Sequence, residues 1–469
     1  MPVLVVDLDG TLIRSDTLYE CFWAGMAENW TTVFTACSGL ANGRATLKRK
    51  LERNAQLSAD QLPYNQVVLD YIHNWREAGG RAVLVTAADE ALAGKIATHL
   101  GLFDEAHGSD GETNLKAERK AEFLKSRYGD KGFAYIGDST ADLPVWAEAG
   151  RAITVDAPPG LRRKVQALGV ETEDLSTGTR PGYLAALRPH QWLKNILVFV
   201  PVIAAQSFEA AVLFQAFLAF AAFSLVSSSG YVLNDLMDLR ADRAHPRKSR
   251  RPLASGRVPI AHGTLMLPLL LLGGLVLAAL NGPELLGIVA LYFLLTTLYS
   301  TVLKRHAVAD IGTLAGLYTL RIITGGIATG LGLSVWLLAF SMFFFFALAA
   351  VKRMAELVDL AGRGGDSVQR RGYFVADLPL VSQMATASGY ISVLVLALYL
   401  NSPTVQNLYQ SPWMLWGICL VLMYWISRVV MITHRGDMHD DPIVYALKDR
   451  KSLVCVLLMG LFAIGATVL

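Results

Sequence analysis

Long apolar stretches fill the second half of the chain and constrain its fold more than any other feature. Nine such segments follow Trp192, and most have the roughly 20 residues that an α-helix needs to cross a bilayer. They lie at about 193–206, 209–234, 262–281, 284–303, 309–330, 332–351, 380–400, 411–431 and 452–469. We expect the first, which is short, to be tilted or partly interfacial. The pattern predicts an all-α transmembrane bundle of about nine helices.

Lys and Arg residues fall in every second loop between these segments. Seven of them lie between residues 240 and 257, and the loops after the fourth, sixth and eighth segments are also basic. The intervening loops, near Glu209, Asn281, Gly330 and Asn401, contain no Lys or Arg. Short cytoplasmic loops are enriched in these residues. We therefore expect a bacterial-type inner membrane protein whose front half is cytoplasmic and whose C-terminus lies outside. A soluble all-helical core does not explain the alternation.

Up to about residue 180 the composition is that of an ordinary soluble domain. The mean hydropathy of +0.39 is therefore an average over two different halves. The N-terminus lacks the pattern of a signal peptide. The four cysteines lack the spacing of a metal site or a disulfide framework. We predict a soluble domain with its linker over residues 1–180 and a membrane domain over 185–469.

Apolar strand-like runs in the front domain end at polar residues. The run VLVV at 3–6 leads directly into Asp7-Leu8-Asp9-Gly10-Thr11, and further strands are expected to end at Thr86, at Gly137 and near Val155. Helical stretches between them predict a doubly wound, Rossmann-like α/β sheet. In such a sheet the active site forms at the carboxyl ends of the strands.

The residues at these ends suit phosphoryl chemistry. A carboxylate such as Asp7 can attack phosphorus, and Asp7 with Asp138 offers the oxygen ligands that Mg²⁺ prefers. Asp9, two residues on, can protonate the leaving alcohol. Thr86 offers a hydroxyl and Lys120 a positive charge for the transferring phosphoryl group. The alternative is that these acids only cap helices.

The order of these motifs resembles the haloacid dehalogenase superfamily over residues 1 to about 160. The resemblance implies that Asp7 is the nucleophile and Asp9 the general acid, with Asp9 marking a phosphatase. It also implies four further assignments: Thr11 completing the first motif, Thr86 in the second, Lys120 (with Lys116 as rival) in the third, and Asp138, supported by Asp142, as metal ligand in the fourth. The helical insert between Thr11 and Ala82 would form a small cap.

A carboxylate cluster stands out at the end of the second apolar segment. Asn234, Asp238 and Asp242 are spaced by four and share one helical face, with Asp235 at its edge. Like charges at this spacing destabilise a helix, and carboxylates near a membrane are costly. Mg²⁺ carrying a diphosphate would compensate, and the following basic residues can bind phosphate oxygens. A merely solvated cytoplasmic loop explains the basic residues but not the acids.

This segment resembles the UbiA-type intramembrane prenyltransferase superfamily over residues 185–469. The resemblance is greatest to its decaprenyl-phosphate phosphoribosyltransferase branch. The motifs that carry it are LRPHQWLKN at 187–195, DRAHPRKSRRPLASG at 242–256, YSTVLKRHAVADI at 299–311 and RGDMHDDPIVYALKDRKS at 435–452. Aromatic prenyltransferases carry a second pair of acids four residues apart, whereas here Asp310 has Leu314 at the partner position.

The resemblance implies roles for residues of the membrane domain. Asn234, Asp235, Asp238 and Asp242 would hold the Mg-diphosphate of phosphoribosyl pyrophosphate. Four basic residues would contact its phosphates: Arg243, His245, Lys248 and Arg251. Lys194 would meet the phosphate of a polyprenyl phosphate acceptor. Two groups would have supporting roles or serve as ordinary cytoplasmic anchors: Lys304, Arg305 and Asp310, and Lys352, Arg353 and Glu356.

Together the two halves predict a bifunctional membrane enzyme of cell-envelope biosynthesis. The transferase would move 5-phosphoribosyl onto the lipid, and the tethered phosphatase would remove the 5-phosphate. We expect one Mg²⁺ in the phosphatase site, at least one in the transferase site, and no nucleic acid partner; a homo-oligomer is left open. The alternatives are an aromatic prenyltransferase that uses a prenyl diphosphate donor, and a front domain that is only regulatory.

Overall fold

The computed structural model describes residues 2–41, 44–55, 57–109, 115–178, 181–366, 371–438 and 442–468. The chain forms two compact units. The first comprises Met1–Arg188 and Tyr231–Leu269, and the second comprises Pro189–Gly230 and Leu270–Leu469. The predicted boundary at residue 180 and residues 439–441 of the 435–452 motif lie outside the described residues.

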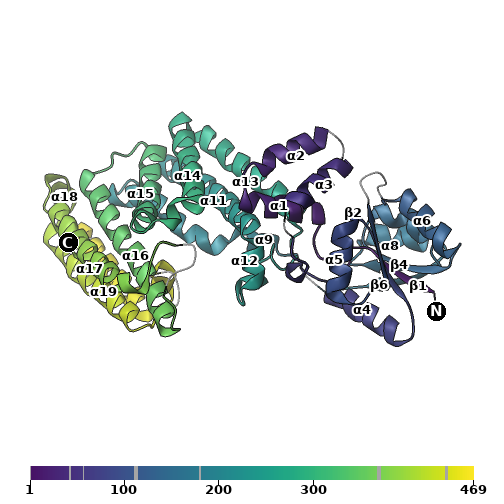
Figure 1. Ribbon diagram of the computed structural model, residues 1–469. Coiled ribbons are helices and arrows are strands. Elements are labelled where there is room, and N and C mark those ends of the chain that lie inside the picture. Colours follow the sequence, from purple (N-terminus) through teal and green to yellow (C-terminus); the bar gives the residue numbers. More distant parts are fainter. Residues whose placement is uncertain are drawn as a thin grey trace. The chain divides into compact units, whose positions relative to one another are not determined.

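Six parallel strands form the sheet of the first unit (Figure 1). They are β1 (Val3–Val6), β2 (Ala82–Asp89), β3 (Glu105–Ser109), β4 (Phe133–Gly137), β5 (Arg151–Val155) and β6 (Glu171–Leu175). Their spatial order is β3-β2-β1-β4-β5-β6, which confirms the doubly wound α/β fold. The order reverses between β1 and β4, where such sheets open a crevice for ligands.

Side chains of alternating direction along β1 build a core on each face of the sheet. Leu4 and Val6 pack on one side with α4 (Gln66–Glu77) and α5 (Glu90–Leu100). Val5 faces the other side, where α6 (Glu118–Tyr128), α7 (Leu143–Glu148) and α8 (Pro159–Gln166) cover the sheet. Burial on both faces explains why the strands read as continuous apolar runs.

The predicted helical insert is present as α1 (Thr17–Glu28), α2 (Thr32–Ala41) and α3 (Arg44–Asn54). Asp16 begins α1 by accepting a hydrogen bond from the Leu18 amide at 2.9 Å. A small core that includes Cys21, Leu47 and Leu51 holds the insert together.

The rest of the first unit consists of α9 (Tyr183–Leu187), the end of α11 (Ala210–Met237), α12 (Leu239–Ala244) and the start of α13 (Ile260–Asn281). Two of these elements, α12 and α13, contact the cap. The Trp23 indole of α1 donates to Thr264 Oγ1 at 2.8 Å. The guanidinium of Arg243 pairs with both carboxylate oxygens of Glu20, at 2.6 and 3.0 Å.

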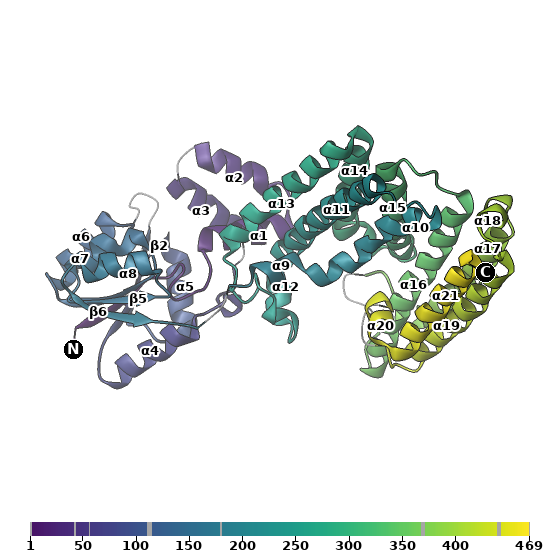
Figure 2. The same ribbon diagram turned by 180° about the vertical axis from the view of Figure 1, so that it is seen from behind.

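Eight helices in the described chain are long and apolar enough to cross a membrane, which confirms a multi-pass membrane protein. Besides α11 and α13 they are α14 (Pro283–Thr301), α15 (Ala309–Thr329), α16 (Val335–Gly362), α17 (Leu378–Leu400), α19 (Trp416–His434) and α21 (Arg450–Val468). The last four lie together in Figure 2, with the short helices α18 (Pro403–Leu408) and α20 (Pro442–Lys448). Exposed apolar residues along α21, such as Val456, Leu461 and Ile464, suit a lipid-facing surface.

The first predicted segment, 193–206, is not a long α-helix. It folds as the 3₁₀-helix η3 (Pro189–Phe199) followed by α10 (Val200–Ala204). A 3₁₀-helix rises about 2.0 Å per residue, against about 1.5 Å for an α-helix, so the two helices laid in line would reach at most about 30 Å, near the thickness of a bilayer core. It packs closely on α15, where a Cβ at Gly325 would fall 2.0 Å from the Val198 carbonyl oxygen.

Candidate functional sites

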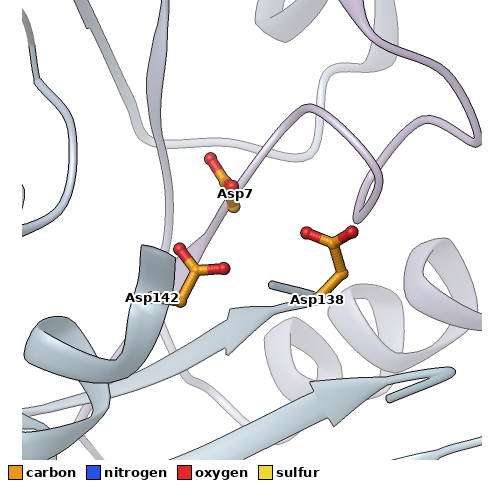
Figure 3. Close-up of side chains that lie close together, drawn as sticks. All are labelled: Asp7, Asp138 and Asp142. Atoms are coloured by element: carbon orange, nitrogen blue, oxygen red, sulfur yellow. The ribbon is translucent and has the colours of Figure 1, made fainter. Parts of the chain in front are cut away.

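Three carboxylates meet at the carboxyl ends of β1 and β4. Asp7 follows β1, Asp138 follows β4, and Asp142 closes the short turn before α7. One oxygen of each lies within 4.8 Å of the others, and Figure 3 shows the three groups around a common space. No other group of three acids, histidines or cysteines in the described part of the chain comes this close.

Burial and mutual repulsion shift the titration of these acids. Burial is the main cause that raises the pKa of Asp7, with Lys120 opposing it. Burial, followed by repulsion from Asp7 and Asp142, raises the pKa of Asp138 to about 8. A divalent cation would offset this repulsion, and hard cations prefer oxygen ligands. The donor set therefore fits Mg²⁺.

A buried chain of polar groups links Asp7 to Asp142. Lys120 Nζ donates to Asp7 Oδ1 at 2.7 Å and to the Tyr135 hydroxyl at 3.0 Å. The Tyr135 hydroxyl donates to Asp142 Oδ1 at 2.8 Å, and Ser139 donates to the other oxygen of Asp142. The structure thus brings Lys120 to the nucleophile, whereas its rival Lys116 lines the surrounding cavity. Tyr135 was missed because it lies within an apolar strand.

Asp9 and Thr86, the other two predicted catalytic residues, differ in their hydrogen bonds and in their burial. Asp9 accepts hydrogen bonds from the Thr17 amide at 2.8 Å and the Thr17 hydroxyl at 3.2 Å. Burial is the main cause that raises the pKa of Asp9 to about 7, a value suited to a general acid near neutral pH. Thr86 is fully buried and accepts from the Ala88 amide. It lies inside β2, which continues to Asp89 rather than ending at Thr86.

A cavity of about 710 Å³ is lined by Asp7, Asp9, Lys120 and Asp138 but not by Thr86, and two of its walls come from outside the sheet domain. Lys48 reaches it from α3 and donates to the Ala87 carbonyl at 2.8 Å. Arg257 and its neighbours line it from the part of the first unit that follows residue 231. The sequence gives no local signal for either contribution.

In the Asp-rich motif two carboxylates are paired with arginines. Arg251 Nη1 donates to Asp235 Oδ1 at 3.1 Å and to Asp242 Oδ2 at 2.6 Å. Arg188 also binds Asp235. Both acids are buried. Burial is the main cause that raises the pKa of Asp242, with Arg251 opposing it.

The helix is interrupted at Asp238, between α11 and α12, yet the spacing of four residues is kept. The Asp238 amide bonds to the Asn234 carbonyl at 2.9 Å, and the Asp242 amide to the Asp238 carbonyl at 2.8 Å. Arg188, which lies in the LRPHQWLKN motif, has a left-handed backbone with φ 53°. Its guanidinium also lies over the Tyr231 ring. Strained backbone of this kind clusters at functional sites.

The other basic residues of this motif face different partners. Arg243 is held by Glu20 of the cap and also donates to the Ala254 carbonyl at 3.1 Å. His245 Nδ1 accepts from the backbone amides of Arg247 and Lys248. The side chains of His245 and Lys248 are exposed. Among the four predicted phosphate contacts, Arg251 is hydrogen-bonded to Asp235 and Asp242, and the positive charge of Lys248 also acts on Asp242.

A second buried network lies in the second unit around Asp310, which has no exposed surface. Its carboxylate accepts from Tyr299 at 2.8 Å and from two nitrogens of Arg353. Arg353 Nη1 also bonds to Glu356 Oε2 at 2.6 Å. The structure therefore joins Arg353 and Glu356 to Asp310. Lys304 and Arg305 follow α14 in the short turn η5 (Leu303–Arg305), and Lys352 precedes Arg353 in α16.

Lys194, the predicted contact of the lipid phosphate, lies over the Tyr318 ring with its Nζ 5.9 Å from the ring centroid. The next residue, Asn195, is buried and accepts from Arg321 Nε at 2.9 Å. Arg321 also donates to the Tyr292 hydroxyl at 2.9 Å. The first apolar segment is thus fixed to α14 and α15 by polar contacts as well as by packing.

Comparison with known proteins identifies both halves. Residues 196–464, more than half of the chain, match the UbiA prenyltransferase family. The chain is a member of that family. Residues 4–146 match the haloacid dehalogenase-like hydrolases. This UbiA protein is therefore a transferase with a phosphatase domain, as the sequence motifs predict.

Relatives of this UbiA protein include one of nearly the same extent. The uncharacterized protein y4nM of Sinorhizobium fredii is 38% identical over 456 residues, which cover 96% of this chain and 88% of that protein. Decaprenyl-phosphate phosphoribosyltransferase of Mycobacterium tuberculosis is 36% identical over 194 residues, 40% of this chain and 64% of the relative. A UbiA homolog from Archaeoglobus fulgidus, solved with GPP and Mg²⁺, covers 60% of this chain and 96% of its own, with 18% identity and a TM-score of 0.46.

Proposed function

We propose that this protein builds a lipid-linked ribose in two steps. Its membrane domain transfers 5-phosphoribosyl from phosphoribosyl pyrophosphate to a polyprenyl phosphate, and pyrophosphate is released. Its phosphatase domain then removes the 5-phosphate and yields polyprenylphosphoryl ribose. The observation that carries the proposal is the Asp7, Asp9, Lys120 and Asp138 constellation in a chain whose membrane domain is similar to decaprenyl-phosphate phosphoribosyltransferase. The transfer leaves the phosphomonoester that such a constellation hydrolyses.

In the transfer step, Asn234, Asp235, Asp238 and Asp242 would hold the Mg-diphosphate of the donor. Arg188 and Arg251, which neutralise Asp235 and Asp242 here, lie where they can bind the diphosphate oxygens once a cation occupies the carboxylates. His245 and Lys248 are accessible for further phosphate contacts, and Lys194 binds the acceptor phosphate. The close pairing of Asp310 with Arg353 favours a structural role for Asp310 over metal binding.

In the phosphatase step, the Asp7 carboxylate attacks phosphorus and forms an aspartyl-phosphate. Asp9 gives its proton to the departing C5 oxygen of ribose, then takes a proton from the water that hydrolyses the intermediate. Lys120 holds Asp7 in place and opposes charge on the phosphoryl group. Mg²⁺ held by Asp7 and Asp138, with Asp142 supporting Asp138, would offset the repulsion between the two anions.

The membrane topology follows from the basic loops. With η3 and α10 as a ninth crossing, the phosphatase domain and all basic loops lie in the cytoplasm, and the C-terminus lies outside. Both active sites then face the compartment that supplies phosphoribosyl pyrophosphate. Mapping of introduced single cysteines with a membrane-impermeant reagent tests this orientation.

The test of function weighs the lipid product by mass spectrometry. Detergent-solubilised protein is incubated with Mg²⁺, a polyprenyl phosphate and phosphoribosyl pyrophosphate. We expect lipid-linked ribose from the wild type, lipid-linked phosphoribose from Asp7→Asn, and neither from Asp235→Asn. A wild-type protein that makes no lipid-linked pentose but consumes a prenyl diphosphate would refute the proposal in favour of prenyl transfer.

A further inference from the structure

The phosphatase cavity contains donors that the proposed chemistry does not use. Ser15 and Arg14 lie in the turn between Asp9 and α1, and both line the cavity. Ser15 is only 5% exposed, and its hydroxyl has no hydrogen-bond partner among the described residues. Arg14 Nε is likewise buried and unpartnered within the described chain, although Arg14 Nη2 donates to Asn65 at 3.4 Å. Buried donors without partners are costly, so these two point to a bound acceptor.

A third donor comes from the UbiA-matching part of the chain. Arg257 lines the same cavity, and two hydrogen bonds hold it, one from Nε to Ser255 Oγ at 3.3 Å and one from Nη2 to the Arg250 carbonyl at 2.6 Å. Gly256 brings this stretch against the Arg14 turn, because a Cβ there would fall 2.5 Å from Arg14 Cβ. Arg257 and Arg14 therefore belong to neighbouring backbone segments.

Two acids that line the cavity beside the catalytic carboxylates are already engaged. Asp16 accepts from the Leu18 amide at the start of α1. Asp156 accepts from the Thr177 amide at 2.8 Å and from the Thr177 hydroxyl at 2.5 Å. Because these carboxylates bond to their own neighbours, they leave Arg14, Ser15 and Arg257 available to a ligand, in a cavity that Lys48, Lys116 and Arg162 also line.

The cavity also reaches a membrane helix. Ile260 and Ala261 line it, and they open α13, which is one of the candidate membrane spans. A headgroup held in the cavity can therefore stay attached to a chain that remains in the bilayer. A volume of about 710 Å³ is within the range of cavities that enclose a whole small ligand, and so exceeds the needs of a lone phosphate.

From these features we propose a second anion subsite, formed by Arg14, Ser15 and Arg257, that binds the phosphodiester of a lipid-linked sugar phosphate. Asp7 attacks the phosphomonoester at one end of the sugar, while this subsite holds the phosphodiester at the other end. The inference rests on the proposed function, since it presumes that the lipid-linked phosphoribose is the substrate of the phosphatase. It explains why the UbiA-matching part of the chain contributes a wall to the hydrolase cavity.

The test compares three substrates on the full chain in detergent. The first is synthetic farnesyl-phosphoryl ribose 5-phosphate, which carries the second phosphate and a short chain. The second is free ribose 5-phosphate, which carries neither. The third is methyl-phosphoryl ribose 5-phosphate, which separates the effect of the charge from that of the chain. Released phosphate gives kcat/KM for each. We expect the wild type to prefer both diester substrates to ribose 5-phosphate by about tenfold to a hundredfold, since a hydrogen bond to a charged group contributes about 1.5–3 kcal/mol.

Variants then test which residues cause the preference for phosphodiester substrates. Arg257→Gln and Ser15→Ala should each lower the ratio of kcat/KM for methyl-phosphoryl ribose 5-phosphate over ribose 5-phosphate by about tenfold. Arg257→Lys should retain part of it. Arg247→Gln, an exposed charge that does not line the cavity, should keep the wild-type ratio.

The outcomes separate this inference from the proposed function. Asp7-dependent hydrolysis of all three substrates at equal kcat/KM overturns the subsite but leaves a phosphatase. A wild-type preference that survives both Arg257→Gln and Ser15→Ala also overturns it. If the wild type hydrolyses none of the three, the phosphatase step itself fails, and the subsite with it. A preference for the farnesyl over the methyl substrate alone would assign the selectivity to the chain and refute the anion subsite.

Discussion

Replacing Gly256 by alanine isolates the contact between the UbiA-matching part of the chain and the phosphatase turn. The φ of Gly256 is +72°, and a side chain in this left-handed region costs roughly 1–2 kcal/mol. A Cβ there would also fall 2.5 Å from Arg14 Cβ and 2.7 Å from the Arg14 carbonyl oxygen. Because the obstacle includes backbone, the overlap adds roughly 1–3 kcal/mol.

Gly169 provides a matched control. Its φ is +69°, but a Cβ there would meet no described atom within 4 Å. Gly169→Ala therefore carries the backbone cost without the overlap. We expect the two variants to differ by roughly 1–3 kcal/mol in local stability, with Gly256→Ala the less stable.

Hydrogen–deuterium exchange of the full chain in detergent measures this difference. In Gly256→Ala, peptides that cover residues 10–16 and 250–262 should both exchange faster, because each loses its packing partner. In Gly169→Ala, both peptides should keep wild-type protection. If residues 10–16 retain full protection in Gly256→Ala, the packing argument for this contact is wrong.

Three further predictions concern the two sites and the membrane core. Lys120→Met should lower phosphate release by about a hundredfold or more while lipid-linked phosphoribose still forms; equal release would remove Lys120 from the site. Chelation by EDTA should stop both steps, and added Mg²⁺ should restore them; activity in excess EDTA would contradict the carboxylate sites. Asp310→Asn removes one of the two carboxylate partners of the buried Arg353, leaving Glu356 as the other, and should lower the free energy of unfolding by roughly 1–3 kcal/mol; an unchanged denaturation midpoint would argue against this pairing.

Residues that follow a strand directly could be placed from sequence alone. Asp7 and Asp138 come immediately after apolar runs, and parallel strands bring such positions to one edge. Lys120 could be chosen over Lys116 only by position, and the structure starts α6 at Glu118, which puts Lys120 in its first turn. Tyr135 could not be foreseen, because its hydroxyl becomes a link only once Lys120 and Asp142 flank the same strand.

Contacts between segments that are distant in the sequence could not be predicted either. Arg243 and Arg251 are equivalent basic residues in sequence, yet one pairs with Glu20 and the other with Asp235 and Asp242. That choice depends on the packing of α1 against α12, to which no local pattern corresponds. The lengths of the apolar segments likewise predicted membrane-spanning helices but not the 3₁₀ geometry of Pro189–Phe199. Hydropathy reports the polarity of a segment and not its rise per residue.

The first unit is discontinuous in sequence, since the chain leaves it after Arg188 and returns at Tyr231. The hydrolase and transferase parts of this protein are therefore not two independent domains that follow one another along the chain. A gene truncated after residue 188 would encode a hydrolase without Arg257 and its neighbours, so excision would change its substrate preference as well as its location. Conversely, an insertion or deletion near Gly256 would alter both activities at once. In a chain that keeps both halves, selection acts on this shared loop, and the Gly256 stretch and the Arg14 turn are expected to change together.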